Sequence, residues 1–194
     1  MTGVGNGLKR VFDVAVSALA LLVLAVPMLI VALVIRLGSR GPALFRQERT
    51  GKEMKPFQLY KFRTMRTDAD PFGDSPTDGA DPRLTRIGRW LRERSLDELP
   101  QLWNVLVGDM SLVGPRPLYL RQAREFNDRQ RRRLEVRPGL TGLAQVAGRG
   151  DLPHEEKLEL DVQYVENAGL WLDARILWRT VLQVFRRKQI YQKW

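Results

Sequence analysis

The residues best suited to chemistry lie in the segment Arg92-Glu-Arg-Ser-Leu-Asp-Glu-Leu-Pro-Gln101, where Asp97 and Glu98 are adjacent. Pro100 follows them, and proline is favoured at the first position of a helix, so we expect both carboxylates at a helix N-terminus. Backbone N–H groups and the helix dipole attract anions there. Beside Arg92, such a pair can hold Mg²⁺, and one carboxylate can attack a phosphorus atom whose charge is neutralised.

A structural role competes with this interpretation. Ser95-Leu-Asp-Glu98 matches the S-x-x-E capping box, and acidic residues are common in the first turn of a helix. Pro100 fits poorly inside a helix that is capped at Ser95, which weakens the capping interpretation without removing it. On this segment alone, capping is favoured over catalysis.

Two further segments favour phosphate chemistry. Arg116 lies between two prolines, which restrict the backbone and suit a preorganised guanidinium that contacts phosphate through two hydrogen bonds. The segment from Arg137 to Arg149 contains three glycines and ends in a cation, and such a loop lets backbone N–H groups approach a ligand. Each segment taken alone is equally well explained as a plain loop.

The composition narrows the chemistry further. The 194 residues include no Cys and one His, which excludes a disulfide framework, a thiolate nucleophile, Cys-based metal sites and a multi-His zinc site. We therefore expect any metal to be a hard cation bound by oxygen, such as Mg²⁺. The 32 Lys and Arg residues exceed the 22 Asp and Glu residues, and the net charge of +10 indicates a polyanionic partner. Nucleic acid, anionic lipid and a phosphorylated substrate all fit that charge.

An apolar segment near the N-terminus favours a partner at a membrane. Val14 to Ile35 carries no charge, and as a helix it would be about 33 Å long, enough to cross a hydrocarbon core of roughly 30 Å. A signal peptide fits poorly, because its apolar region is shorter and no small-residue cleavage site follows this one. The segment therefore predicts association with a membrane.

The flanks of this segment indicate how it lies in the membrane. Lys9 and Arg10 precede it and further cations follow it, so a spanning helix would place one basic cluster on the unfavourable side. Pro27 lies near the middle and gives a bend a physical cause. We predict a re-entrant helix over residues 1–40, broken near Pro27, and a catalytic domain over residues 41–194. A tilted single span is the alternative.

The remainder of the chain predicts an α-rich α+β body. Residues 57–62 alternate as a short strand, and residues 68–82 suit an exposed loop. Helical spacing is present near residues 87–91 and 99–106, and in two C-terminal segments, 155–166 and 171–188. Residues 109–117 and 137–150 are expected to be irregular. The last helix is amphipathic, which fits either the bilayer interface or packing on the body.

In this order the motifs resemble those of the small monotopic phosphoglycosyl transferases of the bacterial sugar transferase family, over roughly residues 8–187. The matching segments are Lys9–Asp13, Phe45–Gly51, Lys61–Met65, Ser95–Asn104, Gly108–Pro117, Arg137–Arg149, Glu155–Asp161 and Tyr164–Val165. Two positions depart from the usual pattern. Val26 replaces the serine that often precedes Pro27, and Leu143 stands where an aromatic residue is frequent.

The resemblance implies a reaction at the cytoplasmic face of the bacterial inner membrane. A sugar-1-phosphate would pass from a UDP-sugar to polyprenyl phosphate with release of UMP, which starts assembly of a lipid-linked glycan. Asp97 would be the nucleophile, through a covalent aspartyl-phosphosugar intermediate, and Glu98 would help to hold Mg²⁺. The substrate contacts implied by motif position are Arg92, Arg116, Arg149, Lys61 and Arg63.

Two other functional classes remain as alternatives. A membrane-tethered protein could use the same arginines only to hold an anion, without catalysis. A nucleic-acid binder is suggested by the charge alone, and the sequence holds no recognised nucleic-acid motif, so we expect no nucleic-acid partner. The donor sugar stays open, as does the oligomeric state, for which a homodimer is one alternative.

Overall fold

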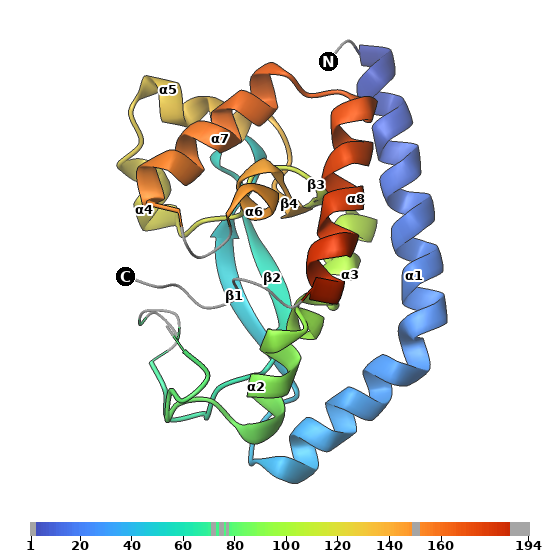
Figure 1. Ribbon diagram of the computed structural model, residues 1–194, viewed down its shortest axis with the longest axis vertical. Coiled ribbons are helices and arrows are strands. Elements are labelled where there is room, and N and C mark those ends of the chain that lie inside the picture. The colour runs from blue at the N-terminus through green and yellow to red at the C-terminus, as the bar shows by residue number, and fades with distance from the viewer. Residues whose placement is uncertain (1–2, 71–72, 74–75, 77, 149–151, 187–194) are drawn as a thin grey trace.

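A computed structural model describes residues 3–70, 73, 76, 78–148 and 152–186. The fold is helix-rich, with two small sheets enclosed by helices (Figure 1). This agrees with the predicted α-rich α+β class. The elements that position the site are the helices α1 (Gly3–Gly38), α2 (Arg86–Glu93) and α3 (Gln101–Val107), and the strands β1 (Leu44–Thr50), β2 (Pro56–Phe62), β3 (Ser111–Val113) and β4 (Gly139–Thr141).

The N-terminal helix α1 is long, apolar and bent. It continues through Pro27 as one helix, and Figure 1 shows it bending toward the body in its C-terminal half. The expected break is therefore a bend within a continuous helix. Proline removes one backbone hydrogen bond and its ring crowds the preceding turn, which accounts for a bend in that half. By length and composition, Gly5–Gly38 could cross a membrane.

One face of α1 packs along the body over most of its length. Ala20, Leu21 and Leu24 contact the larger core cluster, and Met28 and Val31 contact a second cluster around Phe62 and Leu91. The other face leaves its apolar side chains exposed, and only 6% of the most apolar window is buried. The apolar surface that remains is suited to lipid.

The two sheets are small and differ in type. β1 and β2 form an antiparallel hairpin in which Leu44 pairs with Phe62 and Thr50 with Pro56, which confirms the predicted strand at 57–62. β3 and β4 are parallel, with Ser111 opposite Gly139. The prediction that residues 109–117 and 137–150 are irregular is wrong in part, because they contain β3, β4 and the helix α6 (Leu143–Ala147). Residues 149 and 150 lie outside the described residues.

The C-terminal half packs helices around these strands. α4 (Leu120–Arg124), α5 (Asp128–Arg131) and the 3-10 turn η3 (Arg132–Glu135) lead to β4, and α7 (His154–Glu166) and α8 (Leu170–Arg186) follow. The last two confirm the helices expected at 155–166 and over the described part of 171–188, since residues 187 and 188 lie outside the described residues. α8 buries Asp173 and Ile176, whereas Trp171 and Trp178, seven residues apart on one face, are 76% and 64% exposed. Both the packed and the exposed faces expected of this helix are thus present.

Candidate active site

Asp97 and Glu98 lie in a single 3-10 turn, η2 (Leu96–Glu98), between α2 and α3. Ser95 precedes it with a left-handed backbone, at φ 56°, and its side chain makes no capping hydrogen bond. α3 begins only after Pro100. The capping-box interpretation of Ser95 and Glu98 is therefore wrong, and the two carboxylates are available for another role.

Asn104 sets the distance between this turn and the β1–β2 hairpin. Its side chain is fully buried, donates to the carbonyl oxygen of Gln58 at 2.7 Å and accepts from the N–H of Tyr60 at 3.1 Å. These bonds satisfy the free edge of β2 and fix α3 beside it. Lys61, the next residue of β2, is thereby brought to the carboxylates.

Glu98 is held by two cations. Its Oε1 accepts from the ammonium of Lys61 at 2.7 Å and from the guanidinium of Arg116 at 3.1 Å. Burial alone would raise the pKa of Glu98, but the two charges and their hydrogen bonds outweigh burial and hold that pKa well below its usual range. Glu98 is therefore ionised, and its second oxygen has no hydrogen bond among the described residues.

Unlike Glu98, Asp97 is not held by a neighbouring cation among the described residues. It is 8% exposed, and within the described part of the chain its carboxylate has no hydrogen bond or ion pair. Burial raises the pKa of Asp97, as does the charge of Glu98, whereas the charges of Lys61, Arg92 and Arg116 lower it. A partly desolvated carboxylate that is not engaged by donors is a stronger nucleophile than one that is fully hydrogen-bonded.

The structure brings some of the predicted residues to this turn and places others elsewhere. Lys61 and Arg116 contact Glu98 directly, and Arg92, in the last turn of α2, is close enough to act on Asp97 electrostatically. Arg63 is buried at the end of α1, where its guanidinium donates to the carbonyl oxygens of Ser39 and Arg40. The predicted contact Arg149 lies outside the described residues.

The basic residues before the apolar segment contact the protein. Lys9 pairs with the Asp173 carboxylate of α8 at 2.7 Å. Arg10 donates to the carbonyl oxygens of Val105 and Leu106, at 2.6 and 2.8 Å, where α3 ends. Both cations therefore attach α1 to the body, a role that the count of flanking charges did not predict.

Arg49 is a cation that sequence reasoning missed. Its guanidinium lies 3.7 Å from the centre of the Tyr119 ring and donates to Gln47 Oε1 at 2.6 Å. Burial lowers its pKa to about 10, so Arg49 remains charged at neutral pH, and its charge acts on both Arg116 and Glu98. The motif Phe45–Gly51 contains this residue, but nothing in its spacing separates Arg49 from Arg46.

The donor set fits a magnesium ion. Asp97 and Glu98 offer carboxylate oxygens that are not engaged by donors, and oxygen is the ligand that Mg²⁺ prefers. Among the described residues there is no cluster of three or more acidic, His or Cys side chains. Mg²⁺ is usually held by one or two carboxylates, with water and substrate phosphate as the other ligands, so two carboxylates are sufficient.

Nearly the whole chain matches a family of known proteins. The sequence model described as bacterial sugar transferase matches residues 4–187. The uncharacterized sugar transferase EpsL of Bacillus subtilis is 46% identical over 185 residues, which cover 95% of this chain and 91% of that protein. A Caulobacter vibrioides protein named UDP-glucose:undecaprenyl-phosphate glucose-1-phosphate transferase is 44% identical and covers 94% of this chain and 72% of its own.

A third relative carries a different sugar in its name. The undecaprenyl-phosphate galactose phosphotransferase of Salmonella typhimurium is 39% identical over 95% of this chain, which spans 42% of that protein's length. The family match covers nearly the whole chain and includes η2, the β1–β2 hairpin and the Arg116 segment. The chain belongs to the bacterial sugar transferase family.

Proposed function

We propose that this chain transfers a sugar-1-phosphate from a UDP-sugar to polyprenyl phosphate at a membrane surface. The observation that carries the proposal is the unengaged carboxylate of Asp97 beside a Glu98 held by Lys61 and Arg116. The Caulobacter and Salmonella relatives support it, since their names state undecaprenyl-phosphate transfer. Their two names give different sugars, so they support the reaction class and leave the donor sugar open.

In the first step, an Asp97 oxygen attacks the phosphorus that bears the sugar. The bond from that phosphorus to the bridging oxygen breaks, and UMP leaves with the oxygen and its electron pair. The product is an aspartyl-phosphosugar. Lys61 and Arg116 stand beside the carboxylate pair and offset the negative charge that phosphate brings to Asp97.

In the second step, an oxygen of polyprenyl phosphate attacks the same phosphorus and displaces the Asp97 carboxylate. The result is a polyprenyl-diphosphate sugar and a regenerated enzyme, so the kinetics should be ping-pong. Asp97 and Glu98 would hold Mg²⁺, which, when bound, neutralises phosphate charge and orients the donor diphosphate. Removal of Mg²⁺ with a chelator should abolish turnover and leave the fold intact, because the residue contacts described above hold the elements together.

We further propose that the enzyme is monotopic, with α1 re-entrant and the body at the cytoplasmic face of the inner membrane. A helix that spans a bilayer would contact the body only near one of its ends, yet α1 contacts the body from Lys9 to Ile35. Full spanning would carry the ion pairs and cations around α1 into hydrocarbon, which is costly. The bend within α1 supports entry and exit on one side.

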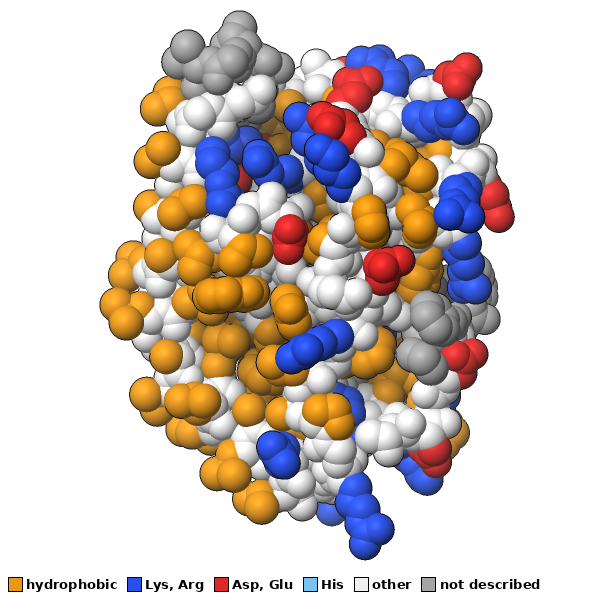
Figure 2. Space-filling model, turned by 180° about the vertical axis from the view of Figure 1, so that it is seen from behind, with side chains coloured by type: hydrophobic (Ala, Val, Ile, Leu, Met, Phe, Trp, Pro, Cys, Tyr) orange, Lys and Arg blue, Asp and Glu red, His pale blue; other side chains and the backbone are white. Residues whose placement is uncertain are grey.

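The exposed apolar surface supports the same orientation. Figure 2 shows hydrophobic side chains gathered over the α1 side of the molecule, whereas most of the charged side chains lie toward the top and the opposite edge. α2 and α3, which pack against α1, expose Trp90 and Trp103. Tryptophan is favoured at the boundary between lipid and water, so these side chains would lie at the membrane interface.

The decisive assay is a panel of UDP-sugars, each incubated with polyprenyl phosphate and Mg²⁺, with release of UMP as the readout. Asp97→Asn should abolish UMP release while the protein stays folded and still binds the donor. Glu93→Gln, on α2 nearby, is the control and should retain turnover. Donor binding without turnover in the wild type would instead support the tethered anion binder.

Membrane topology has its own test. The chain has no native cysteine, so Asn6→Cys and Arg40→Cys each introduce one reactive thiol near an end of α1. A membrane-impermeant thiol reagent should label both from the cytoplasmic side. Labelling of the two positions from opposite sides would refute the re-entrant arrangement.

A further inference from the structure

The segment that carries Arg116 is fixed at four consecutive carbonyl groups. Pro115 accepts from the Gly139 N–H at 2.8 Å, and Leu118 accepts from the Thr50 N–H at 2.9 Å. Between them, the Arg116 carbonyl accepts from the Arg133 guanidinium at 2.7 Å. The Pro117 carbonyl accepts from the Arg49 guanidinium at a longer 3.5 Å. Because prolines flank Arg116 on both sides, its backbone has little remaining freedom.

Arg133 makes its contact from inside a buried ion pair. Its guanidinium also binds the Asp161 carboxylate, and the two side chains are 2% and 3% exposed. Oδ1 of Asp161 has no hydrogen bond among the described residues. Burying two charges costs free energy that their attraction only partly returns, so a buried ion pair is poor evidence for a purely stabilising role.

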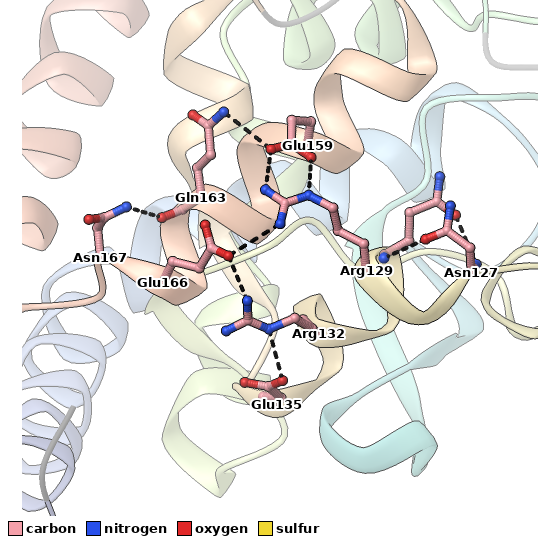
Figure 3. Close-up of polar contacts among 9 residues, drawn as sticks. Asn127, Arg129, Arg132, Glu135, Glu159, Gln163, Glu166 and Asn167 are labelled. Atoms are coloured by element: carbon pink, nitrogen blue, oxygen red, sulfur yellow. Dashed lines mark hydrogen bonds and ion pairs between the residues drawn. The ribbon is translucent and has the colours of Figure 1, made fainter.

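Two neighbouring ion pairs already connect η3 and α5 to α7 without burying a charge. Arg129 on α5 pairs with Glu159 on α7 at 2.6 Å, and Arg132 on η3 pairs with Glu166 at 2.6 Å (Figure 3). These pairs join the same segments as Arg133 and Asp161 but remain partly exposed. The segments are thus already connected without a buried charge, and what Arg133 adds is its bond to Arg116.

We propose that Arg133 and Asp161 are positioning residues for Arg116, and that they fix its backbone so that its guanidinium stays over Glu98 and the donor phosphate. The proposal rests on the proposed function, in which Arg116 contacts phosphate. Asp161 orients the Arg133 guanidinium, Arg133 holds the Arg116 carbonyl, and the Arg116 side chain reaches Glu98 at 3.1 Å. A misplacement of the order of 1 Å at a reacting group can lower a rate about a hundredfold.

The test replaces the pair by apolar residues of similar size, Arg133→Met with Asp161→Leu. Such replacements of buried ion pairs are often neutral or stabilising, so the protein should fold, with an unchanged or higher melting temperature. UMP release should nevertheless fall by about tenfold to a hundredfold. In an Arg116→Ala background the same pair of substitutions should cause no further loss, because the residues act through Arg116.

The matched control is Arg129→Met with Glu159→Leu, the exposed pair on α5 and α7, which should change turnover less than twofold. If the buried replacement fails to fold, Arg133→Lys keeps the ion pair while its single ammonium cannot reproduce the fork that reaches Arg116. Its turnover should also fall by about tenfold or more.

Hydrogen exchange gives a readout that does not depend on the reaction. The peptide covering residues 111–119 should exchange faster in the buried-pair variant than in the wild type or the control. Unchanged exchange, unchanged turnover, or an equal loss with and without Arg116 would each overturn the positioning role. Wild-type protein that releases no UMP with any donor would refute the proposed function instead, while the exchange result would still decide the coupling of this pair to the Arg116 segment.

Discussion

The hydroxyl of Ser111 donates a hydrogen bond of 2.7 Å to the carboxylate of Asp13. Asp13 lies within the apolar helix α1, and Ser111 begins β3, which leads directly to the Arg116 segment. The other carboxylate oxygen accepts from the N–H of Leu112 at 3.1 Å. The apolar helix α1 and the strand that precedes the Arg116 segment are therefore joined by one buried carboxylate.

Replacing Asp13 should destabilise the protein. Asp13→Ala leaves the Ser111 hydroxyl and the Leu112 N–H buried without their acceptor, which costs about 1–3 kcal/mol of unfolding free energy. The measurement is urea denaturation in neutral detergent micelles. Glu48→Gln, at an exposed position of β1, is the control and should stay within about 0.5 kcal/mol of the wild type. Equal stability of the Asp13 variant would show that this contact is not made.

Arg10 offers a test that separates protein contacts from lipid contacts. Its guanidinium binds the carbonyl oxygens of Val105 and Leu106, at the end of α3 where the helix dipole favours a cation. Arg10→Met should therefore lower the unfolding free energy by about 1–2 kcal/mol even in detergent that carries no charge. If Arg10 served only to bind anionic lipid, its loss would appear in anionic bicelles and vanish in neutral micelles.

Asp97→Asn should abolish turnover and at the same time leave the fold unharmed. Burial raises the pKa of Asp97 in the folded protein above its value in the unfolded chain. Above the pH at which the unfolded chain loses this proton, the raised pKa therefore lowers the stability of the folded state. The buried Asp97 carboxyl group therefore lowers stability at neutral pH, and an amide of the same shape removes that cost. We expect an unfolding free energy unchanged or higher by up to about 2 kcal/mol in metal-free buffer. A clearly less stable variant would contradict this account of Asp97.

Part of this site was readable from residue order and part was not. Composition and spacing predict the adjacent carboxylates, the apolar helix and the restricted backbone at Arg116. Ser95 matches a capping box but adopts a left-handed backbone where α2 meets η2, and its side chain makes no capping hydrogen bond. Local pattern alone does not distinguish a cap from such a turn.

The larger misses arise from contacts between distant segments. β3 and β4 have three residues each, which is too short to show a period-two pattern. Each is a strand because it pairs with the other, with Ser111 opposite Gly139. Arg63 and Lys61 are two residues apart on one motif, yet one binds the end of α1 and the other binds Glu98. A count of charges does not distinguish these two cations. They have different partners because the end of α1 lies beside Arg63, whereas the turn η2 lies beside Lys61.

Two glycine substitutions with opposite expected effects on stability test how closely α2 must approach the segment that follows β2. A Cβ on Gly88, in α2, would overlap the backbone carbonyl group of Thr64, whereas a Cβ on Gly7, in α1, would have no atom within 4 Å. Replacing a helical glycine by alanine ordinarily stabilises by about 0.5–1 kcal/mol, so Gly7→Ala should raise stability by that amount.

Gly88→Ala should instead lower stability by about 1–3 kcal/mol, because α2 can only relieve the overlap by moving away from Thr64. Since Arg92 lies in the last turn of the same helix, the shift would also move its charge relative to Asp97, and UMP release should fall more than stability alone explains. Urea denaturation and turnover, measured on both alanine variants side by side, provide the comparison. A stabilised Gly88→Ala protein with full turnover would show that this close approach does not position α2.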